Sequence, residues 1–250
     1  MIETRDLWRS FGSQPVLRGV NLRVDSGETV VIIGRSGGGK SILLKHLIGL
    51  LQPDAGEVLV DGQSITGMNE RQLLKVRRKF GMLFQGAALF DSLTVAENVA
   101  FALRQSRQWT EKEMALKVCE ALEMVDLPGI EAKMPGALSG GMRKRVGLAR
   151  AIVYKPEIIL YDEPTTGLDP MVADSIDQLI IRICQRLKVT SLAVTHDMRS
   201  AGRIAQRILM LHEGRIYVGG TPEEIFRSAD PIVSRFVQGI SDATELAVPR

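Results

Sequence analysis

The sequence predicts an α/β fold in which a helical segment is inserted into a core of strands and helices. Continuous apolar runs of strand length, TVVII at 29–33 and EIILY at 157–161, are typical of strands buried on both faces of a sheet. Helical periodicity follows both runs, in KSILLKHLIGLL at 40–51 and from about residue 172 to 187. From about residue 71 to 153 the character is helical, which indicates an insertion of about 70 residues.

The N-terminal part is expected to be an antiparallel β unit. VLRGVNLRV at 16–24 alternates apolar and polar residues, and GEVLVDGQSI at 56–65 is typical of a hairpin or edge strand with a glycine-containing turn. Further along, RILMLHEGRIYVGG at 207–220 predicts another hairpin, which turns at Glu213 and Gly214.

One helix of the insertion carries both a start and a stop signal. In WTEKEMALKVCEALEMVDL at 109–127, Thr110 is the expected N-cap and Glu113 completes a capping box. Pro128 and Gly129 are expected to end this helix.

A C-terminal tail, residues 226–250, is expected to be partly helical. Its residues Ile232, Val233, Phe236 and Val237 fall on one helical stripe. Two interpretations remain open: the stripe forms an interface with another chain, or it packs against its own chain.

Composition and charge narrow the possible classes. The 32 Lys and Arg residues against 29 Asp and Glu give a formal net charge of +3, which does not point to a nucleic-acid partner. MIETRDLWRS lacks the apolar region of a secretory signal, and no run approaches the roughly 18 apolar residues that cross a bilayer. Cys119 and Cys184 have no CxxC and no nearby His pair, so we expect small buried side chains in a reducing compartment.

The segment GRSGGGKS matches G-x-x-x-x-G-K-[ST] at every position, after a predicted strand and at the start of a predicted helix. Its glycines let backbone amides point inward, and the helix start adds its dipole. A glycine-rich turn with a chance lysine is the alternative, but the context favours a nucleoside-triphosphate site in which Lys40 reaches the phosphates and Ser41 ligates Mg²⁺. The predicted nucleotide-binding residues are Gly34, Arg35, Ser36, Gly37, Gly38, Gly39, Lys40 and Ser41.

Candidate residues for hydrolysis follow other apolar runs. Asp162 and Glu163 come at the end of EIILYDE, and ligands bind at the carboxyl ends of strands in open α/β sheets. Asp162 would hold Mg²⁺ through water, and Glu163 would position or deprotonate the attacking water. His196 and Gln85 also follow apolar runs and are candidates for contacts to the γ-phosphate and to Mg²⁺ or water. A solvated acidic pair and a structural histidine are the alternatives, which the upstream phosphate loop disfavours.

The segment LSGGM at 138–142 precedes a helical run whose first turns carry Arg143, Lys144 and Arg145. A helix start is already positive, so cations there suggest a strongly negative partner. The cations either add positive potential toward that partner or form a solvated face.

In their order along nearly the whole chain, these motifs resemble those of the ATP-binding-cassette (ABC) ATPases. The matching features are the phosphate loop, the Q-loop at Gln85, the signature LSGGM, the Walker B segment IILYDE, the D-loop GLDP and the switch His196. The resemblance implies a P-loop NTPase with a RecA-like core at about 1–85 and 156–225, a helical subdomain at about 86–155, and one ABC ATPase domain over 1–237.

The resemblance implies ATP and Mg²⁺ as cofactors, with Ser41, Gln85 and Asp162 directed to the metal. Phe11 stands where the family places an aromatic ring on adenine, and an ordinary turn or core aromatic is the alternative.

The resemblance further implies that two copies of the chain share each ATP site. ATP would lie on the phosphate loop of one copy, and Ser139 with the amides of Gly140 and Gly141 of the other copy would meet the γ-phosphate. Two helix starts on one triphosphate neutralise much of its charge, so ATP would join the copies and hydrolysis would loosen them. Asp169 would form part of the interface.

Within the family, the chain looks like the ATPases of MCE-associated, Mla-type lipid transporters. Met142 replaces the usual Gln of the signature, Ile42 stands where Thr is common, and GAALF follows the Q-loop. Such ATPases work with a membrane permease and a periplasmic MCE lipid-binding protein, on the cytoplasmic side of the inner membrane. Leu89, Phe90 and Leu93 would then dock the permease, or they belong to the helical core.

Other functions remain as alternatives. An importer of amino acids, metals or ions would use the same ATPase. A DNA-repair or translation ABC protein is disfavoured because the chain has neither long heptad repeats nor a second cassette. A small-molecule kinase would not explain the signature or the D-loop. The sequence does not identify the cargo.

Overall fold

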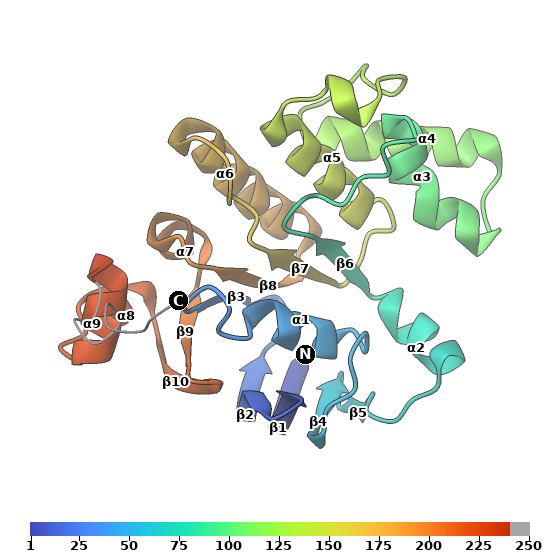
Figure 1. Ribbon diagram of the computed structural model, residues 1–250. Coiled ribbons are helices and arrows are strands. Elements are labelled where there is room, and N and C mark those ends of the chain that lie inside the picture. Colours follow the sequence, from blue (N-terminus) through green and yellow to red (C-terminus); the bar gives the residue numbers. More distant parts are fainter. Residues whose placement is uncertain (241–250) are drawn as a thin grey trace.

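In the computed structural model of the chain, which describes residues 1–240, helices pack around the larger of two β-sheets, and the smaller sheet lies below α1 at the bottom of the view (Figure 1). The smaller sheet has the order β2-β1-β4-β5, and each neighbouring pair is antiparallel. Its strands are β1 Ile2–Phe11, β2 Gln14–Val24, β4 Ala55–Val60 and β5 Gln63–Ser64. This sheet is the antiparallel N-terminal unit that the sequence predicted.

The larger sheet has the order β10-β9-β3-β8-β7-β6. All its neighbouring strands are parallel except the β9–β10 hairpin, which turns at Glu213 and Gly214 as predicted, both at positive φ. Its strands are β3 Thr29–Ile33, β6 Phe80–Leu83, β7 Ile158–Asp162, β8 Thr190–Thr195, β9 Arg207–His212 and β10 Arg215–Gly220.

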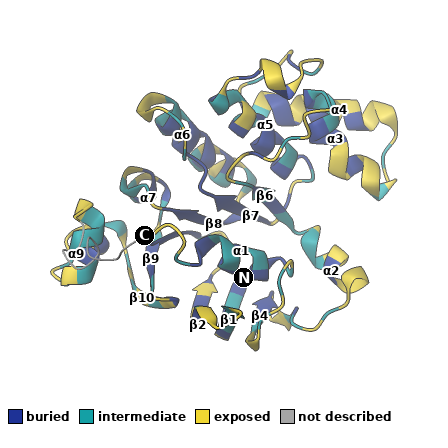
Figure 2. Cartoon of the chain, in the orientation of Figure 1, coloured by how far each residue is buried: buried dark blue, intermediate teal, exposed yellow. Residues whose placement is uncertain are grey.

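Alternate residues of β3 enter two different hydrophobic cores, which explains its uninterrupted apolar sequence. Val31 and Ile33 pack into a core shared with the helices of the insertion. Val30 and Ile32 pack into a second core, shared with helix α1 (Lys40–Leu47) and the smaller sheet. All four side chains are fully buried, and the central strands are uniformly dark in Figure 2. The larger sheet is therefore covered on both faces.

The helical insertion packs beyond the β6 edge of the larger sheet (Figure 1). It contains α3 Val95–Ser106, α4 Glu111–Met124 and α5 Gly140–Ile152, which contact one another. Thr110 and Glu113 form the predicted capping box on α4, and Thr94 with Glu97 forms another on α3.

Two expectations about this region were wrong in detail. The stretch from 71 to 153 is not helical throughout, because after α2 (Glu70–Arg77) the chain forms β6, a four-residue strand paired with β7. Helix α4 ends at Met124, before Pro128 and Gly129, because Asp126 already adopts a left-handed conformation with φ 59°.

The remaining helices complete the C-terminal half. They are α6 Pro170–Leu187, α7 Met198–Ile204, α8 Pro222–Phe226 and α9 Pro231–Gln238. The apolar stripe of α9 packs against the core of its own chain, with Val233 fully buried. This contact corresponds to the intrachain interpretation of the stripe. Residues 241–250 of the predicted tail lie outside the described residues.

The cysteine expectation holds only in part. Cys119 is exposed, contrary to the expectation of burial, because it lies on the outer side of α4. Cys184 is half-buried, with Sγ 3.0 Å from the Ser191 hydroxyl. Within residues 1–240, no helix has the length and apolar character needed to cross a membrane.

Candidate functional site

The phosphate loop connects the end of β3 to the first turn of α1. Gly39 precedes the helix at φ 97°, and a Cβ there would lie 3.0 Å from Val16 Cγ1. Both observations favour glycine. No side chain caps α1, so its first amide groups are available to an anion.

Lys40 is folded back into this loop. Its ammonium group donates to the carbonyl oxygens of Gly34 (2.7 Å) and Arg35 (3.0 Å) and lies 3.5 Å from Glu163 Oε1. Only 5% of Lys40 is exposed, and burial lowers its pKa, although the charges of Glu163 and Asp162 oppose that change. Lys40 is thus held between the loop and the Walker B carboxylates.

The predicted metal ligands Ser41 and Asp162 are in direct contact. The Ser41 hydroxyl donates to Asp162 Oδ1 at 2.7 Å, and burial raises the pKa of Asp162. A hydroxyl and a carboxylate beside a phosphate loop are hard oxygen ligands of the kind that Mg²⁺ prefers. The residues present therefore fit this ion.

The backbone at Glu163 turns sharply out of β7. Its φ of 49° is left-handed, which is uncommon for a residue other than glycine and is often found at functional sites. The Glu163 amide donates to the Val194 carbonyl at 3.0 Å, and the Lys144 ammonium donates to the Glu163 carbonyl at 3.0 Å. These two hydrogen bonds stabilise the left-handed turn. Because of this turn, the side chains of Asp162 and Glu163 leave the backbone in different directions.

The Glu163 carboxylate is surrounded by partners. Nδ1 of His196 lies 2.9 Å from Oε2, and the Thr166 hydroxyl donates to the same oxygen at 2.9 Å. Burial alone would raise the pKa of Glu163, but these hydrogen bonds and the Lys40 charge together hold it below its usual value. Glu163 is therefore kept ionised, as a residue that orients or deprotonates water must be.

A cavity of about 410 Å³ brings most of the predicted residues together. Phe11 stands at its edge, 44% exposed, with its ring 4.9 Å from the Arg9 guanidinium. The lining residues are Phe11, Val16, Ser36, Gly37, Gly39, Lys40, Ser41, Ile42, Gln85, Glu163 and His196. Gly34, Arg35 and Gly38 belong to the same loop, and Asp162 lies behind the lining, hydrogen-bonded to Ser41.

The signature residues do not line this cavity. Ser139 is the N-cap of α5 and accepts a hydrogen bond from the Met142 amide at 3.2 Å. A Cβ on Gly141 would lie 2.6 Å from Val172 Cγ1 on α6, so this glycine also has a packing role within the chain. Asp169 is the N-cap of α6. Within one chain, the predicted phosphate-binding residues thus form two separate groups.

Comparison with known proteins identifies the family. Residues 17–166 match the family model described as ABC transporter. The chain belongs to the ABC transporter family. It is therefore an ATP-binding, ATP-hydrolysing subunit of a transporter. The similarity to solved ABC cassettes confirms the predicted P-loop fold.

The dimeric structure of the ABC cassette MJ0796 matches with a TM-score of 0.82 and 33% identity, over 89% of this chain and 99% of that one. The intermembrane phospholipid transport system ATP-binding protein MlaF of Haemophilus influenzae is 40% identical, over 97% of this chain and 92% of its own length. The probable ribonucleotide transport ATP-binding protein mkl of Mycobacterium leprae is 43% identical, over 95% and 69% respectively. The predicted resemblance to phospholipid-transport ATPases is confirmed by the MlaF match.

In this ABC ATPase the cations after the signature have a role that neither sequence interpretation included. Lys144 is only 5% exposed, and its ammonium group donates to the carbonyls of Gln85 and Glu163. Arg143 donates to the Leu138 carbonyl at 2.6 Å, and Arg145 pairs with Asp126 at 2.9 Å. Arg145 also donates to the Val125 carbonyl at 2.9 Å, so each of the three cations binds a backbone carbonyl of its own chain.

Sequence reasoning also missed Arg150, further along α5. Its guanidinium donates to the carbonyls of Ala87 (2.5 Å) and Ala88 (2.6 Å), two residues at positive φ in the GAALF segment. Lys144 and Arg150 together fasten the Q-loop to the signature helix. No local sequence signal marks these contacts, because they join segments distant in the chain.

Proposed function

We propose that this ABC ATPase drives phospholipid transport between membranes, as one of two copies that enclose ATP between them. The single observation that carries the shared-site part is the separation of the phosphate loop from Ser139 within one chain. A second copy, arranged as in a dimeric cassette, supplies the missing helix start, and the dimeric form of MJ0796 supports this arrangement.

In this account the triphosphate lies on the amides of residues 34–41, and Lys40 leaves the loop carbonyls to bind phosphate oxygens. Ser41 and Asp162, with Gln85, would hold Mg²⁺, which when bound neutralises charge on the β- and γ-phosphates. Glu163 orients and deprotonates the attacking water, and His196 contacts both Glu163 and the γ-phosphate. Phe11 stacks on the base.

A permease docks on the segment after the Q-loop. Phe90 is 44% exposed and Phe101 is 36% exposed, and their ring centroids are 4.6 Å apart. Leu89 is partly buried and packs against the core, as the core interpretation predicted, and docking at the exposed residues of this segment stays a proposal. The buried Asn98 side chain exchanges hydrogen bonds with the Phe90 amide and carbonyl, which fixes the backbone that carries one of the two rings. An exposed aromatic pair on a fixed backbone is a suitable anchor for a partner.

The lipid assignment is supported by the MlaF match, by Met142 in the signature and by the GAALF segment. The permease partner, a periplasmic MCE protein and a peripheral position on the cytoplasmic side of the inner membrane belong to the same proposal. The name of mkl refers to ribonucleotides, which makes an importer of another cargo the second candidate.

Reconstitution tests the cargo directly. The full chain is assembled with its own permease in liposomes of phosphatidylethanolamine and phosphatidylglycerol, and fluorescent phospholipid transfer is followed with ATP. We expect transfer that stops in the Glu163→Gln variant. If a nucleoside monophosphate stimulates ATP turnover and phospholipid is not moved, the importer is correct and the lipid proposal is wrong.

A further inference from the structure

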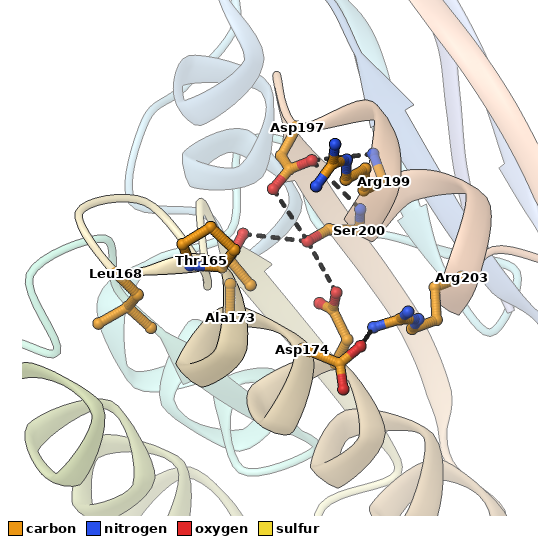
Figure 3. A pocket seen from close by; sticks show the side chains of 10 residues that line it. Thr165, Leu168, Ala173, Asp174, Asp197, Arg199, Ser200 and Arg203 are labelled. Atoms are coloured by element: carbon orange, nitrogen blue, oxygen red, sulfur yellow. Dashed lines mark hydrogen bonds and ion pairs between the residues drawn. The ribbon is translucent and has the colours of Figure 1, made fainter.

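A second polar cluster lies behind the catalytic residues, between α6 and α7. It lines a pocket of about 370 Å³ (Figure 3). At its centre is the Ser200 hydroxyl, which is 1% exposed and donates to Asp177 Oδ2 at 2.8 Å. Thr165 Oγ1 lies 3.2 Å from the same hydroxyl, and Asp197 Oδ2 lies 3.4 Å from it.

The three partners of Ser200 come from three segments, two of which also carry residues that line the ATP cavity. Thr165 follows Glu163 by two residues, and Asp197 follows His196 directly. Asp177 lies on α6, whose N-cap is the D-loop residue Asp169. One buried hydroxyl therefore joins the Walker B segment, the switch histidine segment and the D-loop helix.

We propose that Asp177 is a positioning residue for ATP hydrolysis, which acts through Ser200 to hold the His196 segment in register with the Glu163 segment. The inference rests on the proposed roles of Glu163 and His196. Asp177 and Ser200 are not among the predicted catalytic, nucleotide-binding, metal-binding or interface residues. Neither residue lines the ATP cavity, so their effect is exerted through the two segments and not through the nucleotide.

The chemistry of the cluster depends on the charge of Asp177. An ionised carboxylate only accepts hydrogen bonds, so it takes the single hydroxyl proton of Ser200, and Thr165 must then donate to Ser200. A neutral acid can donate to Ser200 instead, which releases the Ser200 proton toward Thr165 or Asp197. Ionisation of Asp177 therefore selects the arrangement in which Ser200 donates to Asp177 over the one in which Asp177 donates to Ser200.

The surroundings allow this ionisation to change near neutral pH. Asp177 is 2% exposed, and its Oδ1 has no hydrogen-bond partner among residues 1–240. Burial, together with the nearby Asp197 charge, raises the pKa of Asp177 to about 6, although the hydrogen bond from Ser200 acts in the opposite direction and lowers it.

The other charged groups around the pocket come from α6, α7 and α5. Asp174 on α6 pairs with Arg203 of α7, and α7 also contributes Arg199 to the lining. Helix α5, which also packs on α6, presents Arg145 to Ser175 and not to Asp177. The segment after β7 contributes no charged side chain to the lining. Asp197 is thus the charge that acts most directly on Asp177.

The test is steady-state ATP hydrolysis by the purified full chain between pH 5.5 and 8.5, with Asp177→Asn. Asn reproduces the neutral acid with little change in volume. We expect kcat about fivefold below the parental value at pH 8 and within about twofold of it at pH 5.5, because most of the parental Asp177 is then protonated. KM for MgATP should change less than about twofold, because Asp177 does not touch the nucleotide.

Two controls make the test specific. Asp174→Asn removes a charge from the same pocket and helix without touching Ser200, and its kcat ratio to the parental chain should not depend on pH. In a Ser200→Ala background, the pH-dependent difference between Asp177 and Asn should vanish.

A pH-independent ratio for Asp177→Asn, or a difference that survives in the Ser200→Ala background, overturns the inference. Glu163→Gln separates this result from the broader proposal. If Glu163→Gln still hydrolyses ATP, the catalytic assignment fails whatever Asp177 does. If Glu163→Gln does not hydrolyse ATP, a pH-independent ratio of kcat between Asp177→Asn and the parental chain counts against the positioning role alone.

Discussion

The phosphate loop with the Walker B segment differs from the signature segment in how many hydrogen bonds and ion pairs its key residues form within one chain. At the Walker B end, Lys40 and Glu163 are 5% and 6% exposed and are surrounded by hydrogen bonds and charges. At the signature end, Ser139 is exposed, and the one hydrogen bond of its hydroxyl within residues 1–240 comes from the Met142 amide of its own helix. The first end is complete in a single copy, and the second is positioned but faces outward. This difference supports the proposal that two copies share each ATP site.

The largest expected effect on ATP turnover comes from a substitution in the Walker B segment. Glu163→Gln keeps the shape of the side chain but removes the carboxylate that activates water, so we expect kcat to fall about 100-fold or more. ATP binding should persist, and the variant should accumulate as an ATP-bound dimer. Chromatography with and without ATP measures this, and turnover at the parental rate would show that another residue is the base.

The next effect is at the outward-facing end. Ser139→Arg places a bulky side chain at the start of α5, where the γ-phosphate of the second copy is expected, so turnover should fall about tenfold or more. ATP binding by the monomer, followed by fluorescent nucleotide titration, should change less than about twofold, because Ser139 does not line the cavity of its own chain. Loss of monomer binding would place Ser139 in the same site as Lys40.

A smaller effect concerns stability at the same end. Gly141→Ala puts a Cβ 2.6 Å from Val172, and overpacking of this kind destabilises by about 1–3 kcal/mol. Gly136→Ala is the matched control, because a Cβ there meets nothing within 4 Å. Urea denaturation compares the two variants. Equal stability would mean that α5 and α6 separate easily and that Gly141 is needed only for nucleotide.

The smallest effect is the pH dependence of stability at Asp177. Its pKa is raised from 3.8 to about 6 in the folded chain, so the folded state is favoured at low pH and this advantage is lost as pH rises through 6. Asp177→Asn does not bury a charge, and its gain in unfolding free energy should be about 1 kcal/mol larger at pH 8 than at pH 5. A gain that is equal at both pH values would contradict the raised pKa.

The sequence predicted those parts of the molecule that local patterns determine. TVVII predicted a strand buried on both faces, Thr110 and Glu113 predicted a capping box, and GRSGGGKS predicted the phosphate loop. The structure confirms the strand, the capping box and the position of GRSGGGKS between a strand and a helix, because each depends on residues within a few positions of one another. Phosphate binding by this loop stays a prediction.

The features that were missed depend on contacts between distant segments. The strand β6 is four residues long, and only its pairing with β7 stabilises it as a strand. Lys144 follows the signature like a surface cation, but the carbonyls of Gln85 and Glu163 meet it in the interior. Cys119 was expected to be buried, and its exposure depends on which side of α4 packs inward. Periodicity alone does not contain this information.

Complementation between two inactive variants tests the shared site most directly. Ser139→Arg and Lys40→Ala chains are purified, shown to be inactive alone, and mixed under conditions that exchange subunits. A mixed dimer contains one site with an intact Lys40 from the first chain and an intact Ser139 from the second. The account predicts that ATP turnover returns on mixing and rises with the fraction of mixed dimer. A mixture that forms mixed dimers but remains as inactive as its components would contradict it.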